Sequence, residues 1–239
     1  MKKIALILVS VMILVSFAAC GGKDEGTKPE GDGQNTPLLG GWTLSEFEGV
    51  ELPEAAQKAY DKALEGYTGM GYVPYALLGT QVVSGTNYMI LAKGTTVTPE
   101  PVSALYVLVI YEDTEGNCTM ANVSDFDLGA IEEASSEGTP EGLVGGWELN
   151  TLITASGFEP KILDAIDKAA EAIDGKYYTP IVPLGEKVVN GTEYAILGIQ
   201  FDGAENAPDQ YCVLFPVVSS DDTATLEKIA LLDLGSFNQ

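Results

Sequence analysis

Histidine and arginine are both absent from this chain of 239 residues. Without histidine, the chain has no Ser-His or Cys-His pair to activate a nucleophile, and no His-ligated zinc site. Without arginine, it has no bidentate guanidinium clamp for a phosphate or a carboxylate. An enzyme would have to work with Asp, Glu, Lys, Tyr or Ser alone. We therefore predict that the chain is not an enzyme and that it holds no metal and no cofactor.

Positive charge is scarce as well. Lysine and arginine together number 12 against 35 aspartates and glutamates, which gives a formal net charge of −23 at pH 7. Nucleic acids and anionic lipid headgroups are bound through arrays of basic side chains. We therefore exclude nucleic acid as a partner, and we expect the charge to keep an exposed protein soluble.

The N-terminus has the pattern of a cleaved export signal. Lys2 and Lys3 precede an apolar run over residues 4–17, which is short for a transmembrane span. The sequence FAACG at 17–21 resembles a bacterial lipobox, in which Cys20 becomes the lipid-modified first residue. We predict a signal peptide over 1–19 and an anchor at Cys20 that holds the protein in the bacterial cell envelope, exposed outside the cytoplasm. A plain secretory signal is the alternative.

Two tracts with almost no apolar content divide the rest of the chain. Residues 20–37 are rich in Gly, Pro and charge and are predicted to be a flexible tether, and residues 132–142 are predicted to be a linker. The segments between them, 38–131 and 143–239, are the predicted domains. We call them the first and the second repeat.

The two segments are copies of one another. LLGGWTL at 38–44 recurs as LVGGWEL at 143–149, and VVSGTNYMIL at 82–91 recurs as VVNGTEYAIL at 188–197. The offset is 105 for the first pair of blocks (143 − 38) and 106 for the second (188 − 82). Blocks in the same order at a constant offset indicate a duplication. Each copy, of roughly 90 residues, is large enough to support a core.

Each copy is expected to contain a strand, a helix and four further strands. Apolar and polar residues alternate over 42–47 and 147–152, as in a half-buried strand. Apolar residues then recur every three or four positions over 52–67 and 158–173, which predicts a helix in each copy. The last two strands of the copies are expected over 104–111, 119–128, 210–218 and 224–234.

The second and third strands are expected to form a hairpin. Ser84-Gly85 and Asn190-Gly191 stand between Val-Val and Thr-x-Tyr, which predicts a two-residue type I′ turn with positive φ at both central residues. The predicted fold class is α+β, with one helix packed on a four- to five-stranded antiparallel sheet in each copy. Cys118 and Cys212 occupy non-equivalent positions, so free thiols are expected, with an interdomain disulfide as the alternative.

Two of these motifs resemble those of the cystatin family. QVVSGTNY at 81–88 is similar to the family's hairpin signature, Gln-x-Val-x-Gly. PLLGG at 37–41 and GLVGG at 142–146 are similar to its N-terminal glycine segment. The order strand, helix, four strands is also that of the family. The resemblance implies two tandem cystatin-like domains.

Cystatins inhibit papain-like cysteine peptidases by pushing an N-terminal segment and two hairpin loops into the active-site cleft, without reacting. The resemblance thereby implies a peptidase as partner. The residues that it assigns to this contact are Gly40, Gly41, Gln81, Val82, Val83, Ser84 and Gly85, and their counterparts in the second copy are Gly145, Gly146, Val188, Val189, Asn190 and Gly191.

Other interpretations stay open. The recurrence of Val-Val-x-Gly-Thr in both copies also fits a hairpin that serves folding alone. Lys187 stands where the first copy has Gln81, which favours a structural role for the second copy. The acidic turn 113–117 is expected to be solvated rather than to bind calcium. The resulting hypothesis is a surface-anchored lipoprotein that inhibits a cysteine peptidase, and the alternative is a non-inhibitory adhesion or scaffold module.

Overall fold

The computed structural model describes residues 41–45, 51–135, 146–149, 158–172, 176–202 and 209–238. All of them belong to one compact unit, Pro37–Gln239. The predictions for the signal peptide, Cys20, the tether, Gly40 and Gly145 lie outside the described residues. None of the helices within these ranges is long and apolar enough to cross a membrane.

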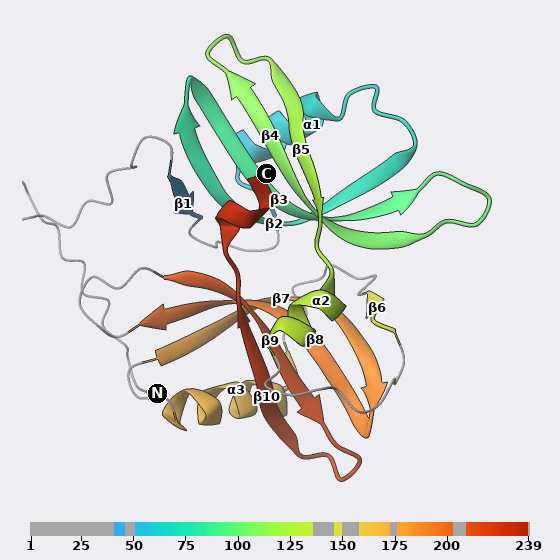
Figure 1. Ribbon diagram of the computed structural model, residues 1–239, viewed down its shortest axis with the longest axis vertical. Helices are drawn as coiled ribbons and strands as arrows, with labels where there is room; N and C mark the ends of the chain where they lie inside the picture. The colour runs from blue at the N-terminus through green and yellow to red at the C-terminus, as the bar shows by residue number, and fades with distance from the viewer. Residues whose placement is uncertain are drawn as a thin grey trace, which may run out of the picture. The chain divides into compact units, whose positions relative to one another are not determined.

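The first repeat forms a five-stranded antiparallel sheet in the order β1-β2-β3-β4-β5 (Figure 1). Its elements are β1 (Trp42–Leu44), α1 (Glu54–Ala63), β2 (Met70–Val83), β3 (Gly85–Thr96), β4 (Ser103–Asp113) and β5 (Cys118–Asp125). Each strand pairs with the strand that follows it in the sequence, and α1 lies between the paired strands β1 and β2 in the chain.

The second repeat forms the same arrangement, a five-stranded sheet in the order β10-β9-β8-β7-β6. Its elements are β6 (Glu148–Leu149), α3 (Pro160–Ala172), β7 (Lys176–Val189), β8 (Gly191–Asp202), β9 (Gln210–Val218) and β10 (Ala224–Leu231). The predicted order of strand, helix and four strands is therefore confirmed in both repeats.

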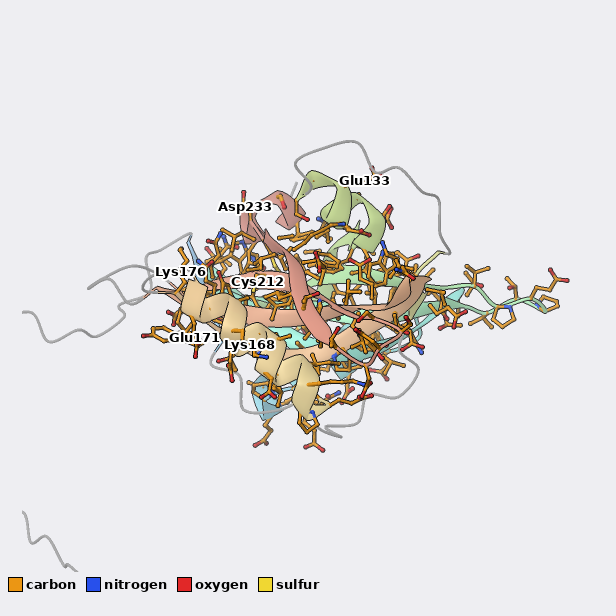
Figure 2. All side chains as sticks on the ribbon, turned by 90° about the horizontal axis from the view of Figure 1, so that it is seen from below. Glu133, Lys168, Glu171, Lys176, Cys212 and Asp233 are labelled. Carbon is orange, nitrogen blue, oxygen red and sulfur yellow. The ribbon has the colours of Figure 1, made fainter. Side chains whose placement is uncertain are left out.

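Each helix covers one face of its own sheet. The apolar stripe of α1 places Ala56 and Ala59 against Ile90 and Leu108 of the first sheet, and all four side chains are buried. In the second repeat, α3 covers Cys212, while its charged residues Lys168 and Glu171 lie at the surface (Figure 2). Small or apolar residues at helical spacing thus let each helix lie close to a sheet.

The opposite faces of the two sheets share a single core. Each of the first repeat's buried residues in this core has a counterpart 106 residues later in the same core. The fully buried members include Leu78, Leu91 and Val107 of the first repeat and Leu184, Leu197 and Val213 of the second. A hydrogen bond also joins the two repeats: the Tyr211 hydroxyl donates to the Leu77 carbonyl at 3.2 Å.

Short helices link the two repeats further. α2 (Leu128–Ala134) follows β5 and packs on β10, while the 3₁₀ helix η1 (Leu234–Asn238) follows β10 and packs on β5. Both begin at the repeated Asp-Leu-Gly sequence. The Asp127 carboxylate accepts from the Gly129 backbone N–H at 2.9 Å, and Asp233 does the same for Gly235 at 2.9 Å. Each repeat thus covers part of the other.

The predicted fold class is wrong. Of the described residues, 55 % lie in strands and 20 % in helices, in two five-stranded sheets and three α-helices, which is richer in sheet than α+β cystatin-like domains with one helix each. The sheets are large because each is buried on both faces. One face of each sheet packs under a helix, and the other face packs against the other sheet. Strands buried on both faces are apolar at consecutive positions rather than at alternate ones, as in the run VLVI at 107–110.

Three local predictions also need correction. Asp222 has the only positive φ among the described non-glycine residues, so neither Ser84 nor Asn190 has the φ of a type I′ turn; instead Val83 pairs directly with Gly85. The last strands end before 128 and 234, because the capping aspartates start α2 and η1 there. Residues 132–134, predicted as linker, belong to α2.

Candidate functional site

Three segments of the first repeat meet at one end of its sheet. Trp42 pairs with Gln81, which brings the N-terminal segment beside the end of β2. Gly85 pairs with Asp113, which places the β2–β3 turn next to the β4–β5 turn. We call this end the first-repeat edge and define it as Gly41, Val82–Gly85 and Asp113–Asn117. The antiparallel register therefore brings together two of the sequence-predicted segments and the acidic turn.

The β2–β3 turn exposes apolar side chains at this edge. Val82 and Val83 are 40 % and 38 % exposed, and Ser84 is exposed as well. The Tyr111 hydroxyl donates to the Ser84 carbonyl at 2.6 Å and ties the turn to β4. The turn therefore presents a narrow, braced projection rather than a loose loop.

Gln81 does not belong to the exposed part of this edge. Its side chain is 8 % exposed, and its Oε1 accepts from Asn87 Nδ2 at 2.7 Å. Both residues lie on the face that turns toward the second sheet, because Asn87 stands two residues before Met89 of the shared core. The structure thus places Gln81 on the buried face of the sheet that is directed toward the second repeat.

The backbone geometry at position 85 requires a glycine. Its φ is +139°, and a Cβ at this position would lie 2.2 Å from the Glu112 carbonyl oxygen. Gly191 repeats both features, with φ +130° and 2.2 Å to the Val218 carbonyl oxygen. The glycine of the hairpin motif is therefore needed wherever the next strand approaches this closely.

The acidic turn of the edge is closed by its own hydrogen bonds. Asp113 Oδ1 accepts from the Glu115 and Asn117 backbone N–H groups, each at 2.8 Å, and Oδ2 accepts from Asn117 Nδ2 at 2.8 Å. The hydrogen bond from the Asn117 side chain is the main cause of the lowered pKa of Asp113. Lys62 Nζ donates to the Gly116 carbonyl at 2.9 Å and fixes the turn to α1.

The corresponding end of the second repeat differs in its charges and in its contact with the helix. Val188 is 67 % exposed, Asn190 is exposed and Val189 is half-buried. Asp222, at φ 65°, pairs with Lys161 in the first turn of α3, whereas Lys62 lies in the last turn of α1. The last turn of α1 therefore contacts the β4–β5 turn, whereas the first turn of α3 contacts the equivalent β9–β10 turn. Of the predicted N-terminal residues here, Gly146 is exposed.

The described residues contain no group of three or more His, Cys, Asp or Glu side chains that could hold a metal ion. Cys118 is half-buried and Cys212 is buried, and both are free. Burial raises the pKa of the Cys212 thiol to about 12, which disfavours the nucleophilic thiolate.

Sequence reasoning missed one polar cluster altogether. Glu132 pairs with both Lys187 and Lys228 where α2 meets the second sheet, and Lys187 also pairs with Glu193. In the sequence, Lys187 stands out only as a departure from the first copy. The signal was present in the aligned copies, since charged residues replace Gln81 and Asn87 at inward positions of a hairpin.

No protein-family model matches the chain, and no curated protein sequence matches it either.

Proposed function

We propose that the protein is a non-catalytic, lipid-anchored protein of the bacterial cell envelope that binds a papain-like cysteine peptidase with the first-repeat edge and blocks its cleft. The observation that carries the proposal is the meeting of three separate chain segments at one sheet end, where Val82 and Val83 are exposed. The lipid anchor rests on the sequence around Cys20 alone.

The edge is suited to a blocking role because it is braced before a partner arrives. Tyr111 holds the turn at Ser84, and Lys62 holds the acidic turn at Gly116. A preorganised edge loses little conformational entropy on docking. Exposed valines supply apolar area to a cleft, and blocking requires no reactive side chain. The absence of histidine from the sequence is compatible with this role.

Titration of papain activity with the full-length protein, purified in detergent, tests the proposal. The wild-type protein should inhibit, and Val82→Asp should weaken inhibition by about tenfold or more, because a carboxylate would enter an apolar contact. Val188→Asp is the matched control, since Val188 is the equivalent, exposed residue of the second repeat. The absence of inhibition by the folded wild-type protein would refute the proposal, as would equal losses in the two variants.

A second candidate is a non-inhibitory adhesion or scaffold protein. It is favoured by Gln81 and Gly85, since packing accounts for both residues without any peptidase. Under this alternative, the hairpin motif recurs because both sheets need it. A partner captured by the full-length protein with no loss of peptidase activity, and with no effect of Val82→Asp, would support it.

A further inference from the structure

Four charged side chains form a cluster across the contact between the repeats. The Glu132 carboxylate of α2 pairs with Lys187 of β7 and, at 2.7 Å, with Lys228 of β10. Lys187 also pairs with Glu193 of β8 at 3.1 Å. The side chains are 13 %, 13 %, 28 % and 5 % exposed for Glu132, Lys187, Lys228 and Glu193. We call these residues the inter-repeat ion cluster.

The charges of the cluster are mutually satisfied. Burial is the largest influence on both Glu132 and Lys187 and opposes their charged forms, yet their hydrogen bonds outweigh it. The pKa of Glu132 is lowered by Lys187 and Lys228, and the pKa of Lys187 is raised by Glu132 and Glu193. The Lys187 ammonium also lies 4.8 Å from the centre of the Trp147 ring. Removal of Glu132 would leave Lys228 without its partner in the cluster, and removal of Lys187 would do the same to Glu193.

The other half of the interface is neutral at the equivalent positions. With the offset of 106, the counterparts of Lys187, Glu193, Lys228 and Glu132 are Gln81, Asn87, Asn122 and Asn238. Asn87 donates to Gln81 at 2.7 Å, and Asn122 Nδ2 donates to the Phe237 carbonyl at 2.8 Å. The apolar part of the interface is nearly symmetric between the repeats, whereas its polar part is charged in one half and amidic in the other.

We call the face formed by the first sheet and α2 the first-repeat face, and the face formed by the second sheet and η1 the second-repeat face. The difference in charge distinguishes unlike pairing, of a first-repeat face with a second-repeat face, from like pairing, of two equivalent faces. If the first-repeat face met that of a second copy, Glu132 would face Gln81 and Asn122 instead of two lysines. If the second-repeat face met its own copy, Lys187 and Lys228 would lose Glu132. Either like pair would bury charge without its counter-charge, which costs far more than the loss of a surface ion pair.

We propose that the inter-repeat ion cluster makes the first-repeat face pair with a second-repeat face, so that one chain closes on itself and does not join a second copy through like faces. The nearly symmetric apolar core permits both kinds of pairing, and the cluster selects between them. The partner that the cluster excludes is a second copy of this chain, because like pairing would bury unpaired charges. This inference is independent of peptidase binding.

The mass of the full-length protein in detergent, measured by sedimentation equilibrium, tests this selection. The wild-type protein should have the mass of one chain. Glu132→Lys should strengthen self-association by about tenfold or more, toward the mass of two chains, because it makes unlike pairing the repulsive one. Glu133→Lys is the matched control, since it makes the same change of charge one residue later at an exposed position of α2 (Figure 2).

A reciprocal exchange completes the design. Glu132→Lys with Lys228→Glu restores one pair of opposite charges across the interface, between positions 132 and 228, and it should return the mass toward that of one chain. Circular dichroism reports whether each variant folds; if Glu132→Lys does not, Glu132→Asn, which copies the residue at 238, should associate in the same direction but more weakly. A wild-type mass of two chains would overturn the proposal, and so would a folded Glu132→Lys that remains a single chain or associates no more than Glu133→Lys.

Discussion

Replacement of Gly85 by alanine should destabilise the protein by about 2–6 kcal/mol. The backbone at Gly85 has φ +139°, and a side chain in such a region costs about 1–3 kcal/mol. The new Cβ would also lie 2.2 Å from the Glu112 carbonyl oxygen, whereas ordinary contact begins at 3.4 Å. The β4 backbone would have to move by about 1 Å, and overpacking of this kind costs about 1–3 kcal/mol. The sum is a large part of a typical stability of about 5–15 kcal/mol.

Urea unfolding followed by circular dichroism measures this loss. Gly66→Ala is the matched control, because Gly66 has φ +76° and nothing within 4 Å of its would-be Cβ. It should lose only the backbone strain, about 1–2 kcal/mol. The difference between the two variants isolates the crowding against β4. A loss for Gly85→Ala no larger than that for Gly66→Ala would show that the approach of Glu112 does not constrain the hairpin, and Gly85 would again be open to a purely functional explanation.

Three further predictions concern the shared core, a cap and pH. Leu78→Ala and Leu184→Ala, at equivalent fully buried positions, should each cost about 2–5 kcal/mol in urea unfolding, with one transition for the whole chain; separate transitions would contradict a shared core. Asp127→Ala should cost about 1 kcal/mol through the lost cap of α2, and an unchanged midpoint would refute that. Acidification should weaken the inter-repeat ion cluster, because the folded-state pKa of Glu132 is lowered and its stabilisation, present above the ordinary glutamate pKa, is lost as pH falls through the folded-state value. Unfolding midpoints of wild type and Glu132→Gln should therefore converge as the pH falls below the ordinary glutamate pKa; a constant difference would argue against the pairing.

The repeat and its element order were predictable because they depend on local signals. VVSGTNY and VVNGTEY give the same hairpin in both copies, and helical spacing places α1 and α3. The bounds of β9, Gln210–Val218, were predicted to the residue. The apolar run 211–218 begins directly after Gln210 and ends at a polar turn. The turn type was missed, because the close approach of Glu112 to Gly85, a contact between strands, decides the local conformation.

The association of the two sheets was not predictable from either repeat alone. A run such as VLVI at 107–110 shows that both faces of β4 are buried, yet it does not say what covers the second face. The same gap affects Gln81: the resemblance assigns it to the peptidase contact, whereas it lies on the face directed toward the second sheet. Comparison of Lys187 with Gln81 held the missing information, since a charged residue at an inward position requires a partner from elsewhere in the chain.

Amide hydrogen exchange of the full-length protein, with and without a papain-like peptidase, tests the proposed contact most directly. Binding through the first-repeat edge predicts slower exchange at Val83–Gly85 and Asp113–Asn117, with no change at the equivalent turns, Val189–Gly191 and Ser219–Thr223. Unchanged exchange at the first-repeat edge in the presence of saturating peptidase, or equal protection at the ends of both repeats, would contradict it.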